Sequence, residues 1–103
     1  MKAIEFAPAA RAELDAAIDQ YELARAGRGR RFAAAVERAV RLIARFPMAA
    51  PAYRRVHSKY GVRRRVVRGF PFVLAYRVLD DRIRIDAVAH MRRQPNYWHR
   101  RVR

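Results

Sequence analysis

The sequence predicts an α+β fold in which a hairpin of two helices packs on one face of a small antiparallel sheet. Three observations support this expectation. Apolar residues recur at helical spacing in the first half of the chain, they alternate at strand spacing in the second half, and glycines and prolines separate the segments. The expected order of elements is β-α-α-β-β-β, and the length of 103 residues fits a single domain, residues 1–103, with one core.

The first half of the chain predicts a short strand and two helices. Apolar and polar residues alternate over residues 2–6, which indicates a strand. Leu14 and Tyr21 lie on one face of a helix predicted over about residues 8–25. A glycine-containing link ends this helix, and a second helix is predicted over about residues 29–46. The apolar stripe of the second helix consists of Phe32, Val36, Val40, Ile43 and Phe46.

The second half predicts three strands after an irregular connection at residues 47–61. The strands are expected over residues 62–68, 72–78 and 82–89. Because the links between them are short, the strands should form an antiparallel meander. Strict alternation in the last strand places four apolar residues on the side that faces the helices, namely Ile83, Ile85, Ala87 and Ala89.

The same alternation predicts a second sheet face that is rich in arginine. Arg64, Arg68 and Arg77 have the parity that points away from the helices, and Arg82 and Arg84 also oppose an inward set. A single exposed arginine is ordinary, but several on one open face favour an acidic partner. Arg65 has the opposite parity, so we expect it at the sheet margin with its charged end reaching water.

The net charge of the chain is +15, and most of it lies in the second half. Residues 1–50 hold nine Lys or Arg and six Asp or Glu, whereas residues 51–103 hold fifteen and three. A general preference for arginine can explain part of the excess but not this asymmetry. The second half should therefore seek a polyanion, such as nucleic acid, the ribosome or an acidic protein.

Several classes of protein are disfavoured by what the sequence lacks. Without cysteine there is no disulfide or thiolate chemistry, and no apolar run approaches the roughly 18 residues of a membrane span. We therefore expect a cytoplasmic protein that does not use a membrane. His57, His90 and His99 have no metal-ligand spacing, and Ser58 lies in no nucleophile motif, so neither a metal nor another cofactor is expected.

The C-terminal stretch AVAHMRRQPNYWHRR gathers residue types that suit three different roles. Histidine, tyrosine and arginine are adequate for metal-free cleavage of RNA, and the same aromatics and arginines are adequate for binding bases and phosphates. Alternatively, the aromatics fold back on the sheet, with Pro95 setting the turn. The residues concerned are His90, Arg92, Arg93, Tyr97 and Trp98.

These motifs together resemble the RelE/ParE superfamily of type II toxin–antitoxin toxins over nearly the whole chain. The ending His-x-Arg-Arg-x-Pro-x-Tyr-Trp, residues 90–98, is similar to that of ParE-like plasmid stabilization proteins. The other matching motifs are ARFP at 44–47, GVRR at 61–64, FPF at 70–72, AYRV at 75–78 and AVAHMRR at 87–93.

The resemblance implies a growth-inhibiting toxin that a cognate antitoxin neutralises through a disordered, often acidic tail. Operator DNA would be reached only through that antitoxin. The resemblance leaves two targets open, because RelE-like toxins cut mRNA on the ribosome whereas ParE-like toxins impair DNA gyrase. A basic nucleic-acid-binding module without toxicity is a third possibility.

The catalytic residues of the RelE-like toxins are only partly present. If the chain is RelE-like, Arg64, Arg68, Arg92, Arg93 and Tyr97 fill their positions. Two further basic positions hold valines, Val66 and Val73, which favours the ParE-like interpretation without a catalytic residue. In that interpretation the residues that bind the target or the antitoxin are Arg64, Arg68, Arg77, His90, Arg92, Arg93, Tyr97 and Trp98.

Overall fold

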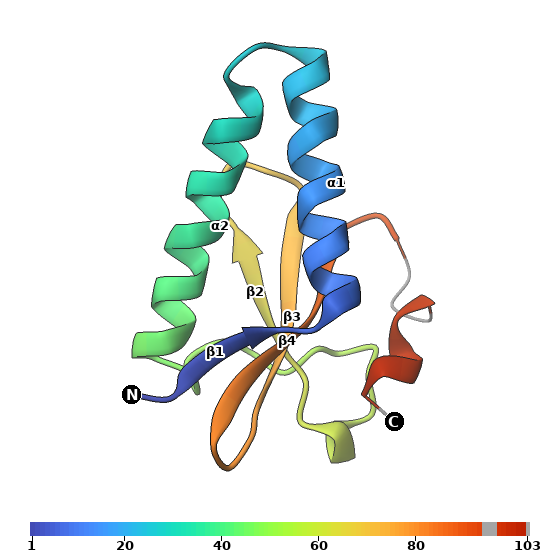
Figure 1. The fold of residues 1–103 in the computed structure, drawn as a ribbon. Coiled ribbons are helices and arrows are strands. Elements are labelled where there is room, and N and C mark those ends of the chain that lie inside the picture. The colour runs from blue at the N-terminus through green and yellow to red at the C-terminus, as the bar shows by residue number, and fades with distance from the viewer. Residues whose placement is uncertain (94–96, 103) are drawn as a thin grey trace.

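The computed structural model describes residues 1–93 and 97–102 and confirms the predicted α+β fold and order of elements. The helices and strands are β1 (Ala3–Phe6), α1 (Pro8–Ala24), α2 (Arg28–Arg45), β2 (Arg63–Val67), β3 (Phe72–Val78) and β4 (Arg82–His90). Two short 3₁₀ helices, η1 (Ser58–Tyr60) and η3 (His99–Arg101), lie in the segments before β2 and after β4. Figure 1 shows α1 and α2 as a hairpin laid along the sheet.

The four strands form one sheet in the order β1-β4-β3-β2. Strands β2, β3 and β4 are an antiparallel meander, as their short links predict. Strand β1 instead pairs in parallel with β4, with Ala3 opposite Arg82 and Phe6 opposite Ile85. The sheet is therefore mixed and not wholly antiparallel, because β1 reaches its neighbour through the helical hairpin, and no tight turn imposes antiparallel pairing on it.

The link between the helices depends on two glycines. Gly27 has a φ of 88°, in the left-handed region that favours glycine. At Gly29 an added Cβ would lie 2.6 Å from the backbone oxygen of Ile18, so only glycine lets α1 and α2 approach this closely. The carboxylate of Glu22 accepts the backbone N–H groups of both glycines and so supplies partners for the first turn of α2.

The larger core lies between the helices and the sheet. Four aromatic rings meet at one end of it, with neighbouring ring centres 5.0 to 6.1 Å apart. They come from Tyr21 and Phe32 on the helices and from Phe70 and Phe72 at the β2–β3 turn.

Phe32, Val36 and Ile43 of the stripe predicted for the second helix are buried. The prediction that Phe46 belongs to this stripe is wrong, because α2 ends at Arg45 and Phe46 is half exposed.

A β-bulge in β4 changes which side chains face the helices. Tyr76 of β3 pairs with Ile85, whereas Ala75 pairs with Ala87, so Asp86 is an extra residue without a partner opposite it. Ile85 therefore belongs to the helix-side core, but Ala87 packs in a separate cluster on the other face. The prediction that Ala87 and Ala89 face the helices is wrong, because the bulge reverses the alternation after Ile85.

The face of the sheet turned away from the helices, called here the second face, carries a core of its own. It is covered by the connecting segment, residues 46–62 between α2 and β2, and by residues 97–102 of the C-terminal segment. Figure 1 shows η3 beside the connecting segment, away from the link between the helices. The buried members of this second core are Val56, Val62, Val73, Ala75, Ala87, Ala89, Trp98 and Val102. The prediction of an open, arginine-rich second face is therefore wrong over the centre of the sheet.

Candidate basic site

Five arginines line a cavity of about 560 Å³ at the margin of the second face. Arg64 comes from β2, and Arg92 and Arg93 follow β4, so the structure brings together three of the predicted site residues. Arg54 and Arg55 complete the set from the connecting segment, and Tyr53 lies beside them in the wall. Sequence reasoning missed Arg54 and Arg55 because their segment has no periodicity that assigns it to a face.

Backbone hydrogen bonds hold the connecting segment against the start of β2. The amide of Arg64 donates to the carbonyl oxygen of Pro51 at 2.9 Å, and the amide of Tyr53 donates to that of Val62 at 2.8 Å. The guanidinium of Arg63 also donates to two carbonyl oxygens of the segment, at 2.7 and 3.1 Å. These bonds fix the wall of the cavity relative to the sheet.

A second hollow, of about 370 Å³, lies between α1 and the end of β4 and is lined by His90, Arg93 and Tyr97 among others. Arg93 lines both cavities, and its guanidinium carbon is 3.8 Å from the centre of the Tyr97 ring. The Nδ1 atom of His90 accepts the backbone N–H of Arg92 at 3.1 Å.

The hydroxyl of Tyr97 keeps its proton at neutral pH. The pKa of Tyr97 is raised to about 12, mainly by burial and also by the negative charge of Glu13, while the nearby Arg93 and Arg101 act in the opposite direction. A general base needs a pKa near the working pH, so Tyr97 is suited to donate a hydrogen bond and poorly suited to remove a proton.

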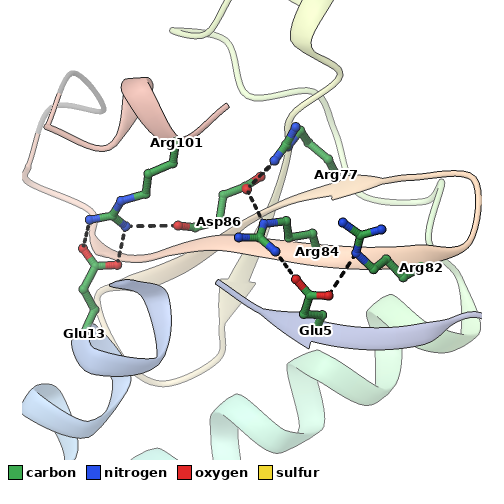
Figure 2. A network of polar contacts seen from close by, with 7 residues as sticks. All are labelled: Glu5, Glu13, Arg77, Arg82, Arg84, Asp86 and Arg101. Atoms are coloured by element: carbon green, nitrogen blue, oxygen red, sulfur yellow. Dashed lines mark hydrogen bonds and ion pairs between the residues drawn. The ribbon is translucent and has the colours of Figure 1, made fainter. Parts of the chain in front are cut away.

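Ion pairs neutralise the arginines at the centre of the second face, as Figure 2 shows. The guanidinium of Arg77 donates two hydrogen bonds of 2.8 Å to the buried carboxylate of Asp86. Arg82 and Arg84 both pair with Glu5 on β1. The contact of Arg77 with a target or an antitoxin stays a prediction, although Asp86 already pairs with its charge inside the protein.

Another ion pair holds the C-terminal segment onto the edge of β4. Strand β1 ends opposite Ile85, and beyond it the amide of Val88 donates to Glu13 of α1 at 3.0 Å. Arg101 donates to both carboxylate oxygens of Glu13, at 2.9 and 3.2 Å, and to the carbonyl oxygen of Asp86 at 3.0 Å (Figure 2). The two side chains thus continue the hydrogen bonding of β4 where β1 stops.

Trp98 and Arg68 lie apart from the two hollows. Trp98 is fully buried, and its ring centre is 5.3 Å from that of Tyr53. The expectation that Trp98 offers a contact surface is corrected, since its ring belongs to the second core. Arg68 is exposed beyond β2 and lines neither hollow. The expected turn at Pro95 falls outside the residues that the structure describes.

Neither a metal cluster nor a membrane-spanning helix is found in the described part of the chain. Among residues 1–93 and 97–102, no three His, Cys, Asp or Glu side chains gather where they could hold a metal ion. In the same residues no helix is both long and apolar enough to cross a bilayer.

Comparison with known proteins decides the family. Residues 4–95 match the family model of the ParE toxin of type II toxin-antitoxin system, parDE. The chain belongs to this ParE toxin family. A solved structure described as the chromosomal ParDE TA system from P. aeruginosa has the same fold, with a TM-score of 0.76, 22% identity, and coverage of 87% of this chain and 96% of that one. No curated protein matches the chain.

Proposed function

We propose that this type II toxin arrests growth by binding DNA gyrase and not by cutting RNA. Position 73, where a RelE-like toxin would carry a catalytic arginine, holds a valine that is fully buried under the second core. The arginine that β3 does carry, Arg77, is neutralised by Asp86. A transition state of phosphodiester cleavage would therefore lack cationic stabilisation from the middle strand, and this is the observation that carries the proposal.

The proposed partner that keeps the toxin inactive is a cognate antitoxin with a disordered, acidic tail. A toxin with a net charge of +15 favours rapid association with such a tail, because opposite charges steer the encounter. The tail would order as it binds, so its affinity should fall as the ionic strength rises.

A supercoiling assay with purified gyrase tests the proposed target. We expect supercoiling to fall as toxin is added in excess, and to recover when an antitoxin encoded beside the toxin gene is added. Unchanged supercoiling at a large excess of folded toxin would contradict the proposal.

A translation extract tests the competing ribonuclease activity. We expect intact mRNA in the presence of the toxin. Cleavage at defined sites that disappears in Tyr97→Phe and Arg93→Ala would instead support a RelE-like endoribonuclease.

A further inference from the structure

Another hollow adjoins the basic cavity, and the two share part of their lining. The neighbouring hollow has a volume of about 720 Å³ and shares the wall of residues 52–55 with the first. We call the two together the basic groove. Its arginines are Arg54, Arg55, Arg63, Arg64, Arg92 and Arg93. Arginines that line two adjoining hollows suit a linear polyanion better than a small compact anion.

Three arginines of the basic groove have no carboxylate partner in the part of the chain that the structure describes. Within residues 1–93 and 97–102, no carboxylate pairs with Arg54, Arg64 or Arg92, in contrast to the paired Arg77 and Arg101. The sequence explains the difference, since it has no Asp or Glu between residues 38 and 79 and none after residue 86. An anionic ligand would therefore meet Arg54, Arg64 and Arg92 without competition from a carboxylate of the described residues.

The chemistry of the groove favours phosphates joined to bases. The planar guanidinium group donates two parallel hydrogen bonds to a phosphate, and all six cations of the groove are arginines. Tyr53 lines both hollows and is partly exposed, so an aromatic ring lies among the cations. Such a ring can stack on a nucleobase, which an acidic peptide does not offer.

We propose that the basic groove binds the phosphodiester backbone of a single nucleic-acid strand without cleaving it. This binding goes beyond the contact with gyrase and does not depend on it. DNA and RNA strands present the same phosphodiester chemistry, so both are used as probes.

The test measures binding of fluorescent single-stranded DNA and RNA oligonucleotides to the full chain by anisotropy over a range of salt concentrations. The groove variant is Arg64→Gln/Arg92→Gln. The control is Arg30→Gln/Arg38→Gln, which removes the same charge from exposed positions on α2. Arg54→Gln, in the exposed connecting segment, is a second groove variant in case the double variant does not fold.

We expect the parent to bind both strands and the groove variant to bind at least about tenfold more weakly. The slope of log K against log salt should also be smaller in magnitude by about 1.4 in the groove variant, or about 0.7 for each arginine removed. Arg54→Gln should flatten the plot by about half as much, and the control should change both quantities much less. Absence of binding by the parent, or equal losses in the groove and control variants, would overturn the proposal. It would also be overturned if poly-glutamate displaced the strand as well as an unlabelled oligonucleotide does. Because gyrase is absent from this assay, the result is independent of the proposed target.

Discussion

The two faces of the sheet are covered in different ways. On one face, helices of 17 and 18 residues supply periodic apolar stripes and a cluster of four aromatic rings. On the second face, the covering segments contain no regular element longer than three residues, yet they bury Trp98 completely. The first face depends on many repeated contacts, whereas the second depends on a smaller set of buried residues around Trp98 and on a few ion pairs.

The difference extends to how the charges are arranged. The exposed pairs of the helices, such as Glu37 with Arg41, lie in water, where an ion pair contributes little. On the second face Asp86 and Glu13 hold arginines in partly buried positions. The C-terminal segment supplies Arg101 to one of these pairs, and the connecting segment supplies Arg54 and Arg55 to the basic groove. The less regular face is thus the one that we expect to meet a ligand.

The largest effects are expected from removing the central side chain of each core. Phe32→Ala should lower the free energy of unfolding by about 3–5 kcal/mol, because a fully buried aromatic leaves a cavity. Trp98→Ala should cost about 3 kcal/mol, toward the lower end of that range, because a short covering segment can detach locally. Urea denaturation measures both losses.

Hydrogen exchange separates the two cores. In Trp98→Ala we expect faster exchange in the connecting segment and in β2, with the helices still protected. Faster exchange throughout the protein would show that the two faces unfold together, and a loss of stability below about 1 kcal/mol in Trp98→Ala would contradict the second core.

The contrast also explains how much the sequence can predict. Helical and strand periodicity identified all six long elements, because each element needs a continuous apolar face. The bulge at Asp86 gives no such signal, because the side chains alternate normally before and after the inserted residue. The insertion changes only which face of the sheet the following residues occupy. Trp98 lies in a basic stretch without apolar periodicity. Its burial depends on contacts with segments that are distant in the sequence, and periodicity does not predict such contacts.

The predicted site shows the same limit. Arg64, Arg92 and Arg93 could be proposed because they follow strands or lie on them. Arg77 has the same parity as Arg64, and only its hydrogen bonds to Asp86 across the strand pair distinguish the two.

A smaller effect is expected at the ion pair that fastens the C-terminal segment. Glu13→Ala should lower the free energy of unfolding by about 2 kcal/mol, because Arg101 loses a charged partner and the amide of Val88 loses its acceptor. Glu13→Gln keeps an acceptor for that amide and should cost less. The matched control, Glu37→Gln, breaks an exposed pair and should cost only about 0.3–0.5 kcal/mol.

Chemical denaturation at low and high salt measures these three variants. Equal costs for Glu13→Gln and Glu37→Gln would mean that the second face gains nothing from partial burial of its ion pair.

The remaining effect is a pH dependence that is absent at neutral pH and confined to alkaline solution. The pKa of Tyr97 is raised from 10.0 to about 12, first by burial and then by Glu13. A raised pKa in the folded state means that the unfolded chain loses the phenolic proton first. Folding stability from Tyr97 is therefore complete below pH 10 and is lost as the pH rises from 10 toward 12. Tyr97→Phe should lack this alkaline loss of folding stability. Denaturation of both proteins at each pH measures the difference.

The phenolate absorbance difference between the parent and Tyr97→Phe measures the ionisation directly. Tyr76, in the core beneath the helices, also has a pKa raised by burial, and its hydroxyl donates to the carbonyl oxygen of Pro47 at 2.6 Å. Tyr76→Phe therefore provides the matching measurement for the helix-covered face. If Tyr97 ionises at its ordinary pKa of 10.0, its hydroxyl is not buried in solution. That result would contradict the packing of the C-terminal segment at Tyr97.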